Sequence, residues 1–155
     1  MKKQIVFLCV GTSKVAGDSL APRVGDKLIE SNLPCYVYGV SNNNVNRKNL
    51  LNYLCFIQKM HPNCILITID AGLSKKQPIG IVDIAKGGIS PARAITKKTF
   101  KIGDIGILGV VGEYTGDVLK TLSGVSEAFI ERFSECIAEI IVNCLKTYYF
   151  NEFHN

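Results

Sequence analysis

The chain has 155 residues, of which 47% are hydrophobic and 20% are charged. That length supports one domain with an ordinary core and excludes two domains with independent cores, while the apolar content excludes a disordered chain. The apolar runs fall short of the roughly 18 residues that cross a bilayer, and the basic start leads into a strand-like run without a signal-peptide cleavage site. We therefore expect a cytoplasmic protein that does not enter the membrane.

The net charge of +5 comes from one segment. Residues 75–101 contain seven basic residues and one acid, Asp83, whereas the rest of the chain carries one net negative charge. Such a segment forms either an ordinary solvated surface or an electropositive lip that attracts an acidic polypeptide or nucleic acid. Phe100 is the only aromatic residue in the segment, which argues against a surface on which bases stack. The composition therefore favours a protein partner over nucleic acid.

Strands and helices alternate in the first half of the chain. Residues 4–10 form a continuous apolar run, which is typical of a strand covered on both faces. The apolar residues that follow repeat at helical spacing, with Asp18 or Ser19 as the predicted N-cap and Pro22 in the first turn. The predicted elements are a strand at 4–10, a helix from about residue 20, a strand at 35–40, a helix at 46–60 and a strand at 63–70.

The second half begins with a change of direction. Too few residues separate Asp70 from the next apolar run, at 79–84, for a crossover helix, so we expect this fourth strand to run antiparallel to the third. An irregular basic stretch at 86–103, a fifth strand at 104–111 and a short helix at 115–122 follow.

A long final helix, capped by Ser126, ends the predicted fold. One of its faces is predicted to be apolar and another to carry an acidic stripe that serves solubility. The apolar face comprises Phe129, Phe133, Cys136, Ile137, Ile140, Cys144 and Tyr148, and the stripe comprises Glu127, Glu131, Glu135 and Glu139.

The six cysteines lie inside apolar segments and form no CxxC pair. We interpret them as small buried hydrophobic residues rather than as disulfide partners or zinc ligands. They are Cys9, Cys35, Cys55, Cys64, Cys136 and Cys144.

This element order predicts a three-layer α/β fold with right-handed crossovers. If the second and third strands flank the first, ligands bind outside the carboxyl ends of the strands where the order reverses. Residues 11–19 leave the first strand at that point, and Asp70 is predicted to end the third strand. Neighbouring strands lie about 4.8 Å apart, so Asp18 and Asp70 can converge there.

Two carboxylates in such a position would share a proton. At about 4 Å and an effective dielectric near 20 they repel by roughly 4 kcal/mol, or about three pK units. One could then act as a base that activates water against a peptide carbonyl, and the other as an acid that protonates the leaving amine. The alternative is a structural role, with Asp18 as a helix cap and Asp70 bound to loop amides. Glu113, after the fifth strand, is either a third carboxylate or a helix-start charge.

Other chemistries find less support in the sequence. The loop from Gly11 to Gly17 lacks both GxGxxG and GxxxxGK[ST], which disfavours nucleotide binding, and GxSxG is absent. His61 is predicted at the opposite end of the sheet and His154 lies in the tail. Two aspartates without a nearby histidine make a sparse ligand set for a transition metal. We therefore expect no metal and no cofactor.

Three sequence runs resemble a known family. IVFLCVGT at 5–12, GDSLAP at 17–22 and ITIDA at 67–71 resemble the YyaC-type sporulation proteins of spore-forming bacteria. These are similar to the germination proteases and, more distantly, to the hydrogenase maturation endopeptidases, and the similarity extends to about Gly112. The resemblance implies a phosphorylase/hydrolase-like sheet in the order 2-1-3-5-4, in a single domain over 1–155. It also implies that Asp18 and Asp70 are the catalytic pair of an endopeptidase.

The chain departs from the family pattern in three ways. Ala21 stands where the usual pattern has glycine, so the first helical turn is expected to sit slightly differently. The chain starts almost at the first strand, so we expect no activation propeptide. Maturation endopeptidases recognise nickel through acidic residues at the Asp18 and Asp70 positions and through a histidine later in the chain. No histidine lies between His61 and His154, so nickel-directed processing has less support.

Together these features predict an endopeptidase of the cytoplasm, or forespore, of a spore-forming bacterium, acting on a protein substrate that is acidic. Asp18 and Asp70 would be catalytic, while Gly11, Thr12, Gly17 and Ser19 would shape the loop that admits the substrate. The alternative is a catalytically silent binding or assembly protein. Its aromatic end would then be an oligomer or partner surface if exposed, although such residues more commonly pack against their own domain. This end comprises Tyr148, Tyr149, Phe150 and Phe153.

Overall fold

A mixed five-stranded sheet in the order β2-β1-β3-β5-β4 organises the computed structural model, which describes residues 2–91 and 100–151. The strands are β1 (Ile5–Cys9), β2 (Cys35–Tyr38), β3 (Ile65–Ser74), β4 (Val82–Lys86) and β5 (Ile105–Glu113). The helices are the 3-10 turn η1 (Gly17–Ser19) and α1 (Leu20–Glu30), α2 (Leu50–Met60), α3 (Val118–Ser123) and α4 (Glu127–Phe150).

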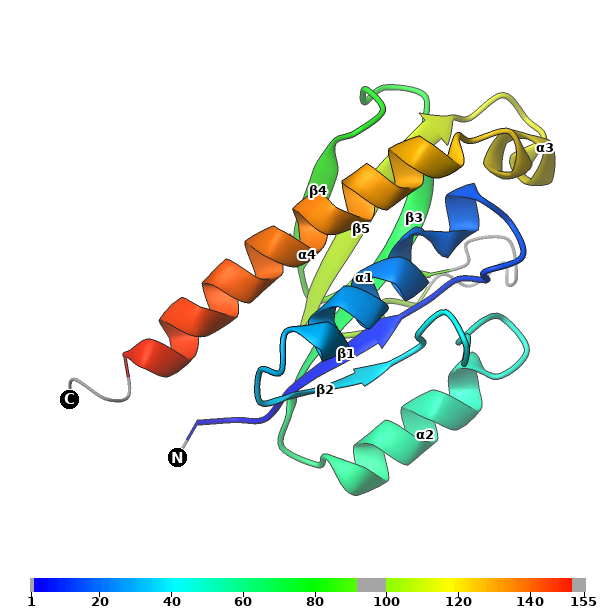
Figure 1. Cartoon of the computed structure of the whole chain (residues 1–155). Coiled ribbons are helices and arrows are strands. Elements are labelled where there is room, and N and C mark those ends of the chain that lie inside the picture. Colours follow the sequence, from blue (N-terminus) through cyan, green and yellow to red (C-terminus); the bar gives the residue numbers. More distant parts are fainter. Residues whose placement is uncertain (1, 92–99, 152–155) are drawn as a thin grey trace.

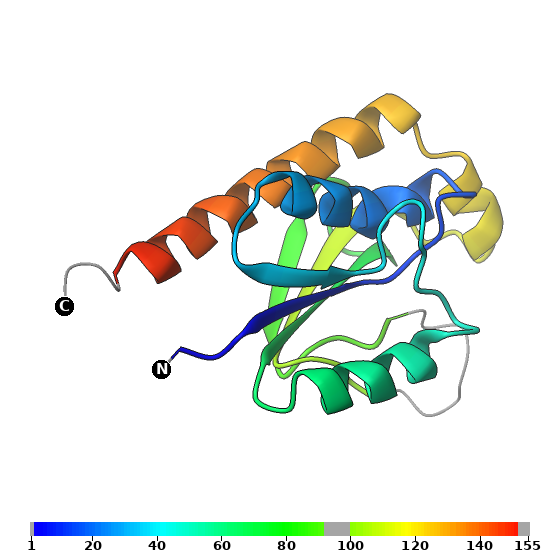
Figure 2. The same ribbon diagram turned by 60° about the horizontal axis from the view of Figure 1, so that its bottom comes forward.

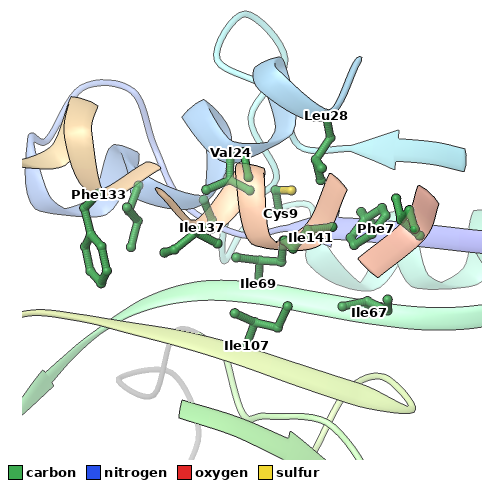
Figure 3. Packing of buried hydrophobic residues seen from close by; sticks show 14 of the residues in the cluster. Phe7, Cys9, Val24, Leu28, Ile67, Ile69, Ile107, Phe133, Ile137 and Ile141 are labelled. Carbon is green, nitrogen blue, oxygen red and sulfur yellow. The ribbon is translucent and has the colours of Figure 1, made fainter. Parts of the chain in front are cut away.

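The helices cover both faces of the sheet. α1 and α4 lie side by side on one face and α2 lies on the other (Figures 1 and 2). Because side chains alternate along a strand, β1 and β3 contribute residues to two apolar clusters. Phe7, Ile67 and Ile69 pack toward α1 and α4, as Figure 3 shows, whereas Leu8 and Leu66 pack toward α2. The chain is thus a three-layer α/β structure, as predicted.

The predicted strand order is confirmed. β1, β2, β3 and β5 run parallel to one another, and β4 pairs with β5 in the antiparallel direction. β4 is therefore also antiparallel in direction to β3, as the short connection between them required.

The predicted end of the third strand is wrong. β3 continues from Asp70 to Ser74, because β5 runs beside it as far as Glu113, with an irregularity between Gly72 and Leu73. β1, in contrast, ends at Cys9, which pairs with Ile69. Asp70 is therefore an internal residue of β3 that lies just beyond the end of β1.

Two predicted helices begin later than their sequence patterns indicated. Residues 46–49 form a turn before α2, in which the Asn46 amide donates to Asn49 Oδ1 at 2.8 Å. The α3 helix begins after Asp117, whose carboxylate accepts from the Lys120 amide at 3.0 Å. The predicted cap of α4 is confirmed, since Ser126 Oγ accepts from the Phe129 amide at 3.3 Å.

The face that α4 presents to the core matches the predicted one only in part: Phe133 and Ile137 are buried and Phe129 and Tyr148 pack against the core, as predicted. Ile140 is 56% exposed, and Cys136 and Cys144 are also exposed. The buried face comprises Ile130, Phe133, Ser134, Ile137, Ala138, Ile141 and Leu145. This orientation directs part of the acidic stripe toward α1, where Glu127 and Glu131 form ion pairs with basic residues. Those two acids therefore do more than confer solubility.

The cysteines also differ from their predicted environment. All six are free, but only Cys9 is fully buried, and Cys55, Cys136 and Cys144 are exposed. The interpretation as buried hydrophobic residues is wrong for these last three, because they lie on outer faces of amphipathic helices.

The aromatic end of α4 packs mainly against its own domain. Tyr148 and Tyr149 are half-buried against the core, and the Tyr149 hydroxyl donates to the Pro34 carbonyl at 2.8 Å. Phe150 is exposed, and Phe153 lies outside the described residues.

Part of the basic segment lies outside the described residues as well, namely Arg93, Lys97 and Lys98. The described members Lys75, Lys76, Lys86 and Lys101 are exposed. Across residues 2–91 and 100–151, no helix is both long and apolar enough to cross a membrane.

Candidate active site

Most of the predicted site residues follow the point where β1 leaves the sheet, next to the strand that contains Asp70. The Val10 amide still donates to the Ile69 carbonyl of β3 at 2.8 Å, but the Gly11 amide donates to Val45 at 2.8 Å, outside the strands. Because Cys9 pairs with Ile69, the next pair along the strands is Val10 and Asp70. Beyond it the chain turns away toward η1, and this uncovers the carboxyl end of β1.

Asp18 lies in η1 and is held against this loop. Its Oδ2 accepts a hydrogen bond from the Thr12 amide at 3.0 Å. A Cβ atom at Gly11 would lie 2.1 Å from the Asp18 carbonyl oxygen, so only glycine permits this close approach. On the other side, a Cβ atom at Gly17 would lie 2.9 Å from the side chain of Leu122 in α3. The two glycines thus let the turn pack tightly between the loop and α3.

The carboxylate of Asp18 does not cap α1. Ser19 is the N-cap residue by position, but its hydroxyl makes no capping bond and instead donates to the Ala16 carbonyl at 2.7 Å. The predicted N-cap position is therefore correct for Ser19, but neither the Ser19 nor the Asp18 side chain caps the helix with a hydrogen bond. The Asp18 carboxylate is directed to Thr12 instead, and α1 begins as a continuation of η1.

Burial shapes the electrostatics of Asp18. Removal from water raises the pKa of this carboxyl to about 6, because the charged form loses hydration, while the hydrogen bond from Thr12 opposes the rise. Burial, and not the predicted repulsion between two carboxylates, is the largest cause of this raised pKa. The group is thus half-protonated at about pH 6 and mostly ionised at pH 7.

Asp70 is 6% exposed and lies on the neighbouring strand. Its Oδ1 accepts from the Ala71 amide at 2.9 Å. By strand alternation its side chain starts on the α2 side of the sheet, because Ile69 points to the α1 side. Asp18 arrives from the α1 side. The two residues therefore approach the end of β1 from opposite faces, where β1 no longer separates them.

Glu113 does not belong to this arrangement. It is exposed at the end of β5 and pairs with Ser74, four residues beyond Asp70 on β3. At a rise of about 3.3 Å per residue this places it roughly 13 Å farther along the strands.

The loop after β1 uses its own amides internally. The Thr12 amide donates to Asp18 Oδ2, and the Ser13 amide donates to Asn44 Oδ1. The Lys14 amide donates to Thr12 Oγ1. In a phosphate-binding loop such amides are free to bind the ligand. Here they are bound within the protein, which fits the absence of nucleotide-binding motifs from the sequence. Asn44 was not among the predicted residues, although the largely polar run at 41–46 indicates a loop whose side chains need hydrogen-bond partners.

His61 lies away from these residues. Its ring contacts Gln4 Oε1, just before β1, at 2.9 Å and the Tyr38 hydroxyl at 2.8 Å. Among residues 2–91 and 100–151, no group of three or more His, Cys, Asp or Glu side chains is arranged to hold a metal ion.

The fold is shared with hydrolytic proteins of known structure. The [NiFe] hydrogenase maturation protease HycI from Thermococcus kodakarensis KOD1 matches with a TM-score of 0.61 and 18% identity, over 94% of both chains. A peptidyl-tRNA hydrolase from Acinetobacter baumannii matches with a TM-score of 0.60 and 9% identity, over 94% of this chain and 88% of that one. At these identities the likeness concerns the fold alone.

Sequence comparison identifies closer relatives. The chain is 36% identical over 110 residues to the "Uncharacterized protein YyaC" of Bacillus subtilis (strain 168). This match covers 70% of the chain and 54% of YyaC, so the chain spans about half the length of that relative. The profile of the family described as "Protein of unknown function (DUF1256)" matches residues 1–140. The resemblance to YyaC-type proteins is confirmed, and the chain belongs to the DUF1256 family.

Proposed function

We propose that this protein is an endopeptidase of the germination-protease type, in which Asp18 and Asp70 act as a pair that activates water. One observation carries the proposal: Asp18, a partly buried carboxyl with a pKa of about 6, is hydrogen-bonded to the loop that leaves β1, and β1 is the neighbour of the strand that contains Asp70. General acid-base catalysis is most efficient when the pKa of the catalytic group lies near the working pH.

The proposed reaction divides the work between the two acids. The ionised carboxylate takes a proton from water as the water oxygen attacks the peptide carbonyl carbon. The protonated carboxyl then gives its proton to the departing amine as the C–N bond breaks. Asp18 suits the acid role because burial favours its protonated form. Gly11, Thr12, Gly17 and Ser19 would support this role by fixing the turn that carries Asp18.

The substrate we propose is an acidic polypeptide. The exposed side chains of Lys75, Lys76, Lys86 and Lys101 would raise the local concentration of such a chain by electrostatic attraction. The resemblance of the three sequence runs to YyaC-type sporulation proteins supports a role in sporulation or germination, in the cytoplasm or forespore. Nickel-directed processing receives less support, since the described residues offer no third ligand beside the two aspartates.

The test is a cleavage assay with acidic polypeptides, including acidic spore proteins, read by mass spectrometry. Asp18→Asn and Asp70→Asn should each lower the cleavage rate by at least about a hundredfold. Asp26→Asn is the matched control, because that carboxylate lies on α1 and accepts from the Ser41 amide at 3.0 Å. Full activity in either site variant would refute the pair.

Absence of cleavage by the unmodified protein under all conditions would favour the catalytically silent binding role instead. Metal analysis of the purified protein separates the nickel alternative, because a stoichiometric ion lost in both aspartate variants would overturn the metal-free mechanism.

A further inference from the structure

Arg23 joins helix α1 to the start of α4. Its Nη1 donates to Glu131 Oε2 at 2.8 Å, and its other terminal nitrogen pairs with Glu127. Glu131 also binds Lys27 Nζ at 2.6 Å, and the hydrogen bonds from Lys27 and Arg23 hold the pKa of Glu131 below its usual value. Two acids of α4 therefore fix the direction in which the Arg23 guanidinium points.

The third nitrogen of the guanidinium, Nε, contacts the turn that carries Asp18. Arg23 Nε donates to Ser19 Oγ at 3.2 Å. Ser19 is only 2% exposed, and its hydroxyl donates in turn to the Ala16 carbonyl at 2.7 Å. The Ser19 amide donates to the same carbonyl at 3.2 Å. Both groups of Ser19 thus close the turn, and Arg23 fixes the hydroxyl.

Asp18 lies inside the turn that these contacts close. Gly11 and Leu122 limit its movement on two further sides, through the close approaches at Gly11 and Gly17. A small displacement of the turn would separate Asp18 Oδ2 from the Thr12 amide, which is 3.0 Å away. Hydrogen bonds weaken steeply with distance and angle, so the position of the turn decides whether this bond exists.

We propose that Arg23 is a positioning residue that, held by Glu127 and Glu131, acts through Ser19 to keep the Asp18 carboxylate on the Thr12 amide. Arginine suits this task because its planar fork places three nitrogens in fixed directions at once. Lysine at this position would keep an ion pair with Glu131 but has a single nitrogen and could not also fix Ser19. An effect of Arg23 on catalysis rests on the proposed function, whereas the contacts that link Arg23 to Ser19 and the Asp18 turn do not.

The test measures hydrogen exchange of the Thr12 amide by NMR in the full chain. Arg23→Lys and Ser19→Ala should each accelerate exchange by at least about tenfold, which corresponds to about 1.4 kcal/mol. The double variant should exchange no faster than the faster single variant, because the two residues act in series. Lys27→Gln is the matched control, since it loses a Glu131 contact without touching Ser19, and should leave Thr12 unchanged.

Exchange of the Ile69 amide in β3, measured in the same samples, reports general loosening. Wild-type exchange at Thr12 in both Arg23→Lys and Ser19→Ala would overturn the proposal. An equal acceleration at Thr12 in Lys27→Gln would also overturn it, because the effect would then reflect the helix contact alone. These readings do not require catalytic activity, so they stand apart from the cleavage assay. In an active enzyme, Arg23→Lys should lower kcat and leave KM unchanged.

Discussion

The two ends of the central strands treat a buried titratable group in opposite ways. Near the amino end, the buried His61 has an uncharged partner at each ring nitrogen, Gln4 and the Tyr38 hydroxyl. At the carboxyl end, Asp18 has the Thr12 amide and a burial that raises its pKa to about 6. Completed neutral hydrogen bonds stabilise a scaffold, whereas a poorly hydrated carboxyl keeps a proton ready for transfer. The difference explains why we assign chemistry to the aspartate end.

The largest effect is expected from crowding the carboxyl end. Gly11→Ala would place a Cβ atom 2.1 Å from the Asp18 carbonyl oxygen, so the turn must move. We expect a loss of about 3 kcal/mol or more in the free energy of unfolding, measured by urea denaturation. Gly116→Ala is the control, because its φ of 102° costs about 1–2 kcal/mol while no atom lies within 4 Å of the added group. Equal losses in the two variants would show that the approach at Gly11 is not tight.

A second prediction separates the two ends by pH. The pKa of Asp18 rises from 3.8 to about 6 on folding, so ionising this group costs stability as the pH rises from about 4 through 6. The full cost is up to about 3 kcal/mol. Asp18→Asn removes this cost and should be more stable than the wild type at about pH 8, with the gain vanishing near pH 4. Urea unfolding at both pH values measures it, and a gain that does not depend on pH would contradict the assigned burial.

A third prediction concerns His61, near the amino end of the central strands, and the hydrogen bond it makes with Tyr38. Tyr38→Phe leaves one ring nitrogen of the buried His61 without its hydrogen bond, so we expect a loss of about 1–3 kcal/mol in stability. Tyr53→Phe is the control, because its hydroxyl bonds Asn43 at an exposed position and should cost less than about 0.5 kcal/mol. Thermal unfolding of the two variants decides, and equal costs would mean that His61 finds another partner.

The smallest effect is expected at Glu113. Its distance from Asp70 along the strands leaves it outside the reacting groups. Glu113→Gln should change the cleavage rate by less than about twofold, a change of at most about 0.4 kcal/mol in the barrier. A tenfold loss in the cleavage assay would place it back in the site.

The sequence was most informative where a pattern has one structural solution. Continuous apolar runs identified the strands, and the short connection after Asp70 predicted the antiparallel β4. Strand ends were less predictable, because they depend on the neighbour. β3 passes Asp70 since β5 continues beside it to Glu113, and no local pattern around Asp70 reports that.

The orientation of α4 shows a second limit. The helix is apolar enough to carry two overlapping stripes, so its periodicity suited either Ile140 or Ile141 as a core position. Contacts with Arg23 of α1 accompany the observed choice, and they are distant in sequence. For the site, the motifs indicated Asp18 and Asp70 as candidates, but they did not reveal that Ser19 binds Ala16 and Arg23 instead of capping α1.

The central claim is that Asp18 and Asp70 function as a pair. Its most direct test is an NMR titration of the Asp18 side-chain carboxyl carbon in the wild type and in Asp70→Asn. Burial and the Thr12 hydrogen bond by themselves account for a pKa of about 6, so a charged neighbour should raise the wild-type pKa above that value, and Asp70→Asn should return it to about 6. An unchanged titration in Asp70→Asn would contradict the pair and leave Asp18 as an isolated buried carboxyl.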